Sequence, residues 1–189
     1  MLYPNNIKKS INKSNTTHAN RGMILEYLIE QANEYYILND IAYIYKKPTP
    51  IGIVNVNYIN GYKRITDAYY KMPSTLDFNG LYKGYYIEFD AKETKSNTSF
   101  PISNVHEHQI KHIRNINNNG GIVFLIISMN DKFFLLPGSI FIDFVDNEKR
   151  KSISYEYLKN NAYEITYGLN GLDYIKVIDK MIGDKYEKD

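Results

Sequence analysis

The stretch that decides the fold is Tyr85-Tyr86-Ile87-Glu88-Phe89-Asp90-Ala91-Lys92, an apolar run with acids at alternate positions and a lysine at its end. Successive side chains of a β-strand point to opposite faces, so Asp90 and Lys92 share one face of this predicted strand. Asp77 lies thirteen residues before Asp90, just ahead of a hairpin whose turn is expected at Lys83-Gly84. The sequence therefore predicts that Asp77, Asp90 and Lys92 come together in space.

This group of side chains suits a metal-dependent nuclease. Two carboxylates supply the hard oxygen ligands that Mg²⁺ prefers, and Mn²⁺ is expected to substitute for it. A lysine ammonium held beside them can stabilise charge that builds on a phosphate oxygen, or orient the attacking water. Spacing alone also fits a solvated strand edge with ordinary charges, because an Asp…Asp-x-Lys pattern is short and common.

Composition limits the class of protein. The 189 residues are 43% apolar with no long uncharged apolar run, so we expect one core and no membrane span. The chain has no cysteine, which excludes disulfides and cysteine-ligated zinc and fits a cytoplasmic location. His108 and His112 share a helix face, but they have no third ligand in register and are not interpreted as a zinc site.

The distribution of basic residues says more about DNA than the net charge of only +2. Residues 1–19 contain Lys8, Lys9 and Lys13 and no acid, so we expect a flexible basic arm ahead of a single domain over residues 20–189. Further candidate phosphate contacts are Arg21, Lys46, Lys47, Lys63, Arg64, Lys71 and Lys95. Lysines cover most protein surfaces, so these charges alone also fit a plain solvated face.

In the first half of the chain, the pattern predicts a helix over residues 20–33 capped by Asn20, and a strand over residues 41–46. The apolar stripe of that helix is expected to consist of Ile24, Leu25, Leu28, Ile29 and Ala32. Residues 51–73 then separate the strand from Asp77. An insertion of that size fits poorly inside a compact core, so we expect a protrusion with a strand near residues 53–58 and a short helix ending at Tyr70.

In the second half, residues 94–104 are expected to form a polar loop, and residues 105–118 a helix that Gly120-Gly121 ends. The continuous apolar run at residues 122–127 predicts a strand covered on both faces, paired with residues 133–136 across Asn130-Asp131. Two more helices are expected at residues 154–160 and 172–182. The whole pattern predicts an α/β fold with a mixed central sheet flanked by helices.

Six short motifs occur in one order along the chain and carry a family resemblance. They are Asn20-Arg21-Gly22-Met23 leading to Glu26, Lys46-Lys47-Pro48-Thr49-Pro50, Ser74-Thr75-Leu76-Asp77-Phe78-Asn79-Gly80, Ala91-Lys92-Glu93-Thr94-Lys95, Thr98-Ser99-Phe100-Pro101 and His106-Glu107-His108-Gln109. Together they closely resemble the RecU family of Holliday junction resolvases, within the PD-(D/E)xK nuclease superfamily. The resemblance covers nearly the whole chain, from Tyr3 to the segment that ends at Lys176.

The resemblance implies a restriction-endonuclease-like fold in which the insertion at about 51–73 is a stalk that enters the centre of a four-way DNA junction. It also implies a Mg²⁺ ligand set of Thr75, Asp77, Asp90 and Gln109, with Lys92 stabilising the transition state. Glu26 is a further candidate beside these ligands, and Glu88, two residues before Asp90 on the same strand face, is an available substitute ligand. A homodimer would supply two sites for paired cuts, and a RecA-type recombinase and a branch-migration helicase would be partners.

One position departs from the family pattern, which has glutamate where this chain has Asp90. Aspartate is one methylene shorter, and a misplacement of about 1 Å can cost about a hundredfold in rate. Two alternatives to a junction-resolving endonuclease stay open, and Asp90 is the reason for the first. One is a junction-binding protein that modulates a recombinase and cleaves weakly or not at all, and the other is a sequence-specific duplex endonuclease of the same fold.

Overall fold

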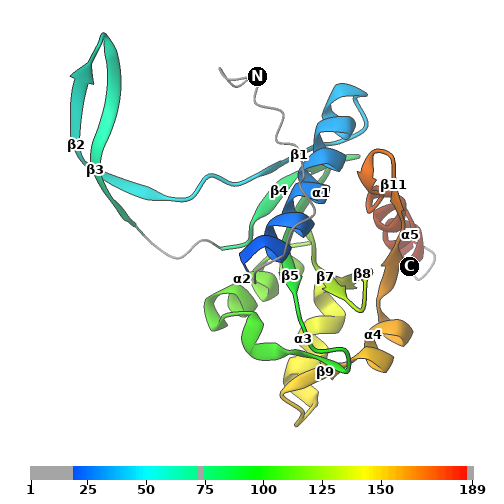
Figure 1. Cartoon of the computed structure of the whole chain (residues 1–189). Coiled ribbons are helices and arrows are strands. Elements are labelled where there is room, and N and C mark those ends of the chain that lie inside the picture. Colours follow the sequence, from blue (N-terminus) through cyan, green and yellow to red (C-terminus); the bar gives the residue numbers. More distant parts are fainter. Residues whose placement is uncertain (1–18, 72–74, 187–189) are drawn as a thin grey trace.

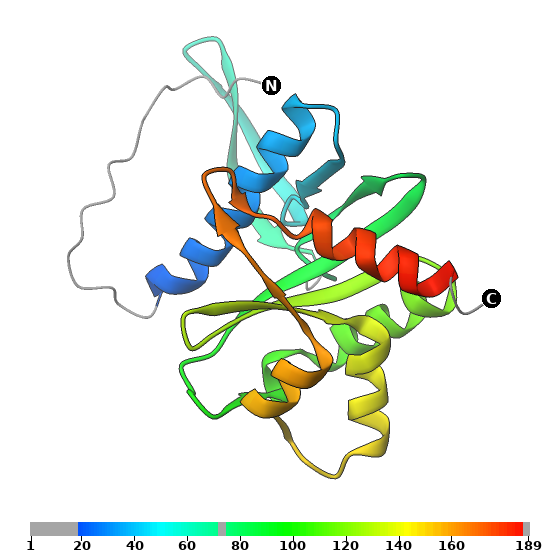
Figure 2. The same ribbon diagram turned by 90° about the vertical axis from the view of Figure 1, so that its right-hand side faces the viewer.

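The computed structural model describes residues 19–71 and 75–186, shown in two orientations in Figures 1 and 2. The expected basic arm with Lys8, Lys9 and Lys13 lies outside these residues, as does the side chain of Arg21. No helix in the described ranges is long and apolar enough to cross a membrane.

A six-stranded mixed sheet forms the centre of the molecule (Figure 1). Its strands, in spatial order, are β1 (Tyr43–Lys46), β4 (Phe78–Tyr82), β5 (Tyr85–Glu93), β7 (Ile122–Met129), β8 (Lys132–Pro137) and β10 (Tyr163–Ile165). Strands β5 and β7 are parallel, and every other neighbouring pair is antiparallel. The predicted α/β class with a mixed central sheet is confirmed.

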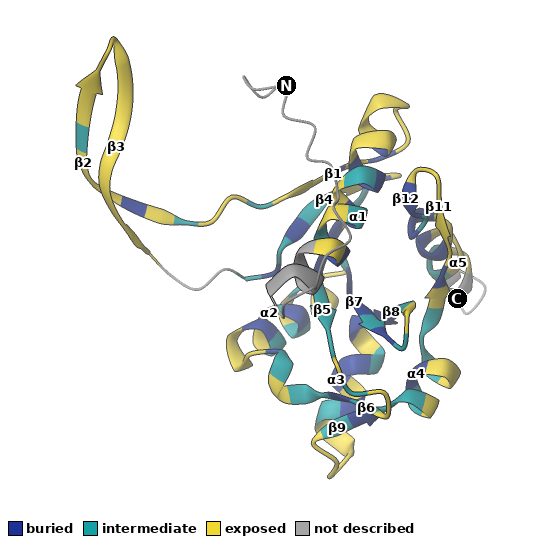
Figure 3. Ribbon diagram, in the orientation of Figure 1, coloured by how far each residue is buried: buried dark blue, intermediate teal, exposed yellow. Residues whose placement is uncertain are grey.

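Helices cover both faces of this sheet. One face packs against α1 (Ala19–Leu38) and α5 (Ile175–Tyr186), and the other against α2 (Glu107–Asn118), α3 (Gly138–Asn147) and α4 (Tyr155–Asn161). Strand β7 contributes Phe124 and Ile126 to the first core and Leu125 and Ile127 to the second, as alternation requires. The expectation of a strand covered on both faces is confirmed, and Figure 3 shows this buried centre.

The turn between β4 and β5 sets the register of the site. Lys83 and Gly84 both have positive φ, 49° and 83°, as a two-residue hairpin turn requires. The register pairs Phe78 with Phe89. Continued by one residue, it brings Asp77 opposite Asp90, as the sequence predicted.

Helix α1 is longer than expected and begins one residue earlier. It spans Ala19–Leu38, so Asn20 lies within its first turn instead of capping it. Leu25, Ile29 and Ala32 are buried as predicted, whereas Ile24 is exposed. The extra length packs Tyr36 into the core, where its hydroxyl donates to the carbonyl of Leu172.

Residues 51–70 form a hairpin of two strands, β2 (Ile51–Ile59) and β3 (Tyr62–Tyr70). The prediction of a short helix that ends at Tyr70 is therefore wrong. Backbone pairing with β2 decides this, because the register runs from Ile51 opposite Tyr70 to Ile59 opposite Tyr62. Figures 1 and 2 show the hairpin extending away from the sheet.

The expected polar loop at residues 94–104 is partly structured. Strand β6 (Ser99–Pro101) pairs with β9 (Ser152–Ser154), and a 3-10 turn, η1 (Ile102–Asn104), leads toward α2. The sequence interpretation missed this ribbon and α3, as well as the small β11 (Tyr167–Gly168) and β12 (Gly171–Leu172) pair. Parallel strands must be joined by a crossover connection, and the crossover between β5 and β7 places α2 over one face of β5.

Candidate active site

Asp90 and Lys92 lie on the face of β5 that α2 covers. The Nζ of Lys92 is 2.8 Å from Oδ2 of Asp90, and the Asp90 side chain is completely buried. Alternation places Glu88 on this same face, whereas Ile87 and Phe89 point into the opposite core. A buried carboxylate is costly unless it is paired, and Lys92 supplies the first partner of Asp90.

Asp77 completes a pair of acids in the position that the hairpin register predicts. Burial, and next the Asp90 carboxylate beside it, raise the pKa of Asp77 to about 7, although Lys92 and Lys46 act in the opposite direction. Two carboxylates so close repel each other when both are charged. A cation placed between them would relieve this repulsion.

Gln109 joins α2 to this carboxylate pair. Its Nε2 donates to Oδ2 of Asp90 at 2.7 Å and to the backbone carbonyl of Thr75 at 2.9 Å. Its Oε1 accepts from the backbone N–H of His106 at 3.1 Å, as part of a capping box at the start of α2. The structure thus brings Thr75, Asp77, Asp90 and Gln109 together, but the amide oxygen of Gln109 faces the helix start and not the carboxylates.

The two oxygens of Asp90 differ in their surroundings. Oδ2 contacts both Lys92 and Gln109, whereas Oδ1 is buried and has no hydrogen-bond partner among the described residues. A buried polar atom without a partner is rare in folded proteins and needs an explanation. An oxygen-seeking cation at Oδ1 would satisfy it, so the residues present fit the expected divalent metal.

Glu88 is the second buried acid on this strand face, and both of its carboxylate oxygens have hydrogen-bond or ion-pair partners. Oε1 forms an ion pair with Lys47 and lies 2.9 Å from Nε2 of His112, and the Tyr86 hydroxyl donates to Oε2 at 2.6 Å. Burial alone would raise the pKa of Glu88, but the bonds from Lys47 and Tyr86 outweigh it and hold the pKa below its ordinary value.

Sequence reasoning missed these partners of Glu88. Lys47 was expected to contact phosphate, and His112 was noted only for its spacing from His108. One signal was available, because His112 follows Gln109 by three residues and so lies on the same face of α2. The distant partner Lys47 leaves no such local signal.

Lys46 lies beside the site, in contact with acids of α1. Its Nζ is 2.6 Å from Glu26 and 3.1 Å from Glu30. Glu26 is therefore held by Lys46.

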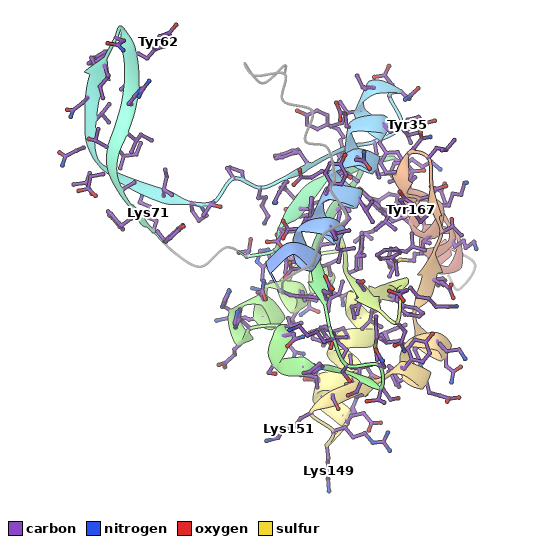
Figure 4. All side chains as sticks on the ribbon, viewed as in Figure 1. Tyr35, Tyr62, Lys71, Lys149, Lys151 and Tyr167 are labelled. Carbon is purple, nitrogen blue, oxygen red and sulfur yellow. The ribbon has the colours of Figure 1, made fainter. Side chains whose placement is uncertain are left out.

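The remaining candidate phosphate contacts are not brought next to the carboxylates. Lys63, Arg64 and Lys71 are exposed on the hairpin or at its base, and Lys95 is exposed in the loop after β5. Figure 4 shows Lys71 near the base of the hairpin and Tyr62 at its tip. Their predicted roles concern a surface separate from the buried acids.

The donor set of the site is small. Among the residues that the structure describes, no three His, Cys, Asp or Glu side chains gather as a metal site. A cation held by Asp77 and Asp90 would therefore take further ligands from other oxygens, such as those of Thr75, or from water. Mg²⁺ commonly keeps several waters and uses few protein ligands.

The mixed sheet flanked by helices, with paired carboxylates and a lysine at its centre, defines an endonuclease of the restriction-endonuclease-like class. A family model described as RecU, Recombination protein U, matches residues 20–180. Proteins named Holliday junction resolvase RecU from Staphylococcus aureus strains JH9, COL and N315 are each 48% identical over 187 residues, covering 95% of this chain and 90% of the relative. The chain therefore belongs to the RecU family.

One solved structure is a more distant likeness. The Holliday junction resolvase Hjc of Archaeoglobus fulgidus aligns with a TM-score of 0.43 and 7% sequence identity, over 75% of this chain and 94% of that one.

Proposed function

We propose that this protein is a Holliday junction resolvase, an endonuclease that cuts phosphodiester bonds in opposing strands of a four-way DNA junction during recombination and repair. Its membership of the RecU family and the names of its relatives support this. The observation that carries the chemistry is the half-buried Asp77 beside the fully buried Asp90, whose Oδ1 has no hydrogen-bond partner among the described residues and whose Oδ2 is 2.8 Å from Nζ of Lys92.

Asp77 and Asp90 would hold Mg²⁺, or Mn²⁺ in its place, and Thr75 and Gln109 would complete the set that the family resemblance implies. When bound, such a cation lowers the pKa of a coordinated water and neutralises charge on the phosphate. Lys92 stabilises the charge that develops on the phosphate oxygens. Gln109 keeps Asp90 in place, and it would have to turn its amide to offer an oxygen.

The hairpin supports selectivity for junctions over duplexes. Every residue of β3 is exposed, and Tyr58, Tyr62, Tyr69 and Tyr70 stand on a two-stranded ribbon that has no core of its own. Aromatic side chains stack on unpaired bases, and Lys63, Arg64 and Lys71 can neutralise phosphates. The hairpin would therefore act as the stalk that enters the junction centre.

Paired cleavage requires two sites related by a twofold axis, and a homodimer would provide them. The basic arm of residues 1–19 would add phosphate contacts through Lys8, Lys9 and Lys13, and Arg21, Lys46 and Lys95 would extend them on the body. A cytoplasmic location, with a RecA-type recombinase and a branch-migration helicase as partners, would follow from this function.

Asp90 supports one alternative, a junction-binding protein with weak cleavage. Its side chain is shorter than the family glutamate, and Lys92 and Gln109 both hold the same oxygen. The alternative predicts tight junction binding without efficient cutting.

The deciding experiment incubates purified protein with labelled four-way junction, duplex and single-stranded DNA, with and without Mg²⁺. A resolvase cuts only the junction symmetrically and only with metal. A duplex endonuclease cuts the duplex at defined sequences, and a binding protein retards the junction and leaves it intact. Asp77→Asn serves as the control for contaminating nuclease.

A further inference from the structure

The hairpin joins the body through two segments, and both of them reach the active site. The outgoing segment follows β1 at Lys47, and the returning segment enters the site at Thr75 and Asp77. The backbone N–H of Lys47 donates to the carbonyl of Asp77 at 2.7 Å. Its Nζ donates to Oγ1 of Thr75 at 2.6 Å and pairs with Glu88. One residue of the outgoing segment thus holds the returning segment at two points.

Glu88 is a fixed anchor for this contact. Its side chain is almost completely buried, and its oxygens bind His112 and Tyr86 in addition to Lys47. Because these bonds come from the segment after β1, from β5 and from α2, the carboxylate has little freedom to turn. The Lys47 ammonium is partly buried against it and is therefore placed differently from the exposed lysines of the hairpin.

The contacts continue from Lys47 to the metal-binding acids. Lys47 binds the hydroxyl of Thr75, and Gln109 binds the carbonyl of the same residue. Gln109 also donates to Asp90. A continuous series of hydrogen bonds therefore runs from the base of the hairpin to Asp90, and a second bond from Lys47 fixes the backbone of Asp77.

We propose that Lys47 and Glu88 form a clamp that positions Thr75 and Asp77 relative to Asp90, and that this clamp joins the hairpin to the catalytic site. Lys47 is then a positioning residue and not a phosphate contact. The proposal rests on the proposed function, since the acids that it positions are those of the nuclease site. It also gives junction binding by the hairpin a direct path to the cleavage machinery.

The test uses the full chain carrying Lys47→Met together with Glu88→Gln, which removes both charges and keeps both shapes. The matched control is Lys132→Met, because Lys132 is also ion-paired, with Glu164 at 2.9 Å on the far side of the sheet. Lys63→Met serves as the comparison for a lysine that contacts phosphate. Three quantities are measured: single-turnover cleavage of a four-way junction at saturating protein, metal-free junction affinity over a range of salt, and Mn²⁺ binding by calorimetry.

We expect the double variant to cut about a hundredfold more slowly, because a misplacement of about 1 Å costs that much. Its Mn²⁺ affinity should fall at least about tenfold, as when residues that orient metal ligands are lost. Junction affinity and its salt dependence should match the parent, whereas Lys63→Met should weaken binding and flatten the salt dependence. Lys132→Met should leave all three quantities unchanged.

The proposal is overturned if the folded double variant cuts and binds Mn²⁺ like the parent, or if its only defect is the altered salt dependence of a phosphate contact. Should the double variant fail to fold, Tyr86→Phe decides, since it removes only a hydroxyl, which donates to Glu88 and accepts from the side-chain amide of Asn79, from a ring that is 42% exposed. We expect a several-fold loss of rate and Mn²⁺ affinity, and parent-like values would reject the clamp. A parent that binds Mn²⁺ but cuts no junction would instead overturn the proposed function, and the calorimetry would still test the clamp.

Discussion

The β2–β3 hairpin and the β5–β7 pair are built from similar residues and lie in opposite surroundings. Both are rich in Ile, Val and Tyr or Phe. On β7 nearly every side chain is buried, whereas every residue of β3 is exposed, including Tyr70 at 81%. A lone two-stranded hairpin is only marginally stable in water. Strand propensity therefore does not distinguish a core strand from a protruding one. The distinction depends on whether other elements cover the strand.

Each region also carries the kind of residue that folding alone would place elsewhere. The central strand buries Glu88 and Asp90, and the hairpin exposes aromatic rings. Buried charge and exposed apolar surface both cost stability, so each indicates a binding role. Under the proposed function, the central strand would carry the chemistry and the hairpin would recognise the shape of the substrate, and mutation can test the two roles separately.

The largest effect is expected from Asp77→Asn, which breaks only the chemistry. Cleavage should fall roughly a thousandfold or more, because the lost interaction acts mainly in the transition state. Junction binding should stay nearly intact, since the change adds no repulsion toward phosphate. Gel-based cleavage and metal-free binding assays measure the two quantities. Asp179→Asn, at an exposed acid paired with Lys83, is the control, and normal cutting by Asp77→Asn would exclude Asp77 from the site.

Lys92→Ala should lower cleavage by roughly 10²–10³, the usual cost of removing one preorganised charge partner. Metal binding should be retained, because Asp77 and Asp90 stay in place. Single-turnover kinetics and calorimetry with Mn²⁺ measure the two outcomes. Loss of Mn²⁺ binding in this variant would contradict the role assigned to the lysine.

Replacing residues 54–70 with a short Gly/Ser linker should break only the substrate selectivity. We expect the preference for four-way junction over duplex to fall by about ten- to a hundredfold. This corresponds to losing the binding free energy of roughly one to two stacked bases. The free energy of unfolding should change little, because the side chains of β3 are exposed. Light scattering must first show that the oligomeric state is unchanged. A variant of unchanged mass that still prefers junctions would place selectivity in the spacing of the two sites.

The smallest effect concerns the stability of the metal-free protein. The pKa of Asp77 is about 7 in the fold against an ordinary value of 3.8. The neutral carboxyl of Asp77 contributes stability that is fully present below the ordinary pKa, at about pH 4. This contribution is lost as the pH rises through the folded-state pKa of about 7. Asp77→Asn stays neutral, so between pH 5 and pH 8 it should gain on the order of 1–2 kcal/mol relative to the parent.

Urea unfolding in EDTA at pH 5 and pH 8 measures this difference. Asp179→Asn is again the control, because its bonds to Lys83 and Tyr82 outweigh burial and hold the pKa of Asp179 below its ordinary value. Asp179 is thus charged at both pH values, and its variant should show no change between them. A gain for Asp77→Asn that does not depend on pH would mean that burial and Asp90 do not raise the pKa of Asp77 in the fold.

Local sequence determined the geometry of the central hairpin and of the acids beside it. Alternation placed Asp90 and Lys92 on one face, and the Lys83-Gly84 turn fixed the register that brings Asp77 opposite Asp90. These features involve residues close along the chain, where period and turn chemistry are strong guides. The family resemblance added Thr75 and Gln109, which the structure brings to the same place.

Only the tertiary structure distinguished Glu88 from Asp90 and a strand from a helix at residues 62–70. Glu88 is saturated by Lys47 and His112, which are 41 and 24 residues away along the chain, whereas Oδ1 of Asp90 is left without a partner among the described residues. Strand β3 exists because its backbone pairs with β2, although none of its side chains is buried. Periodicity records which face of a segment is apolar, but it does not record which distant group meets a carboxylate or a backbone amide. Those pairings depend on the path of the whole chain in space.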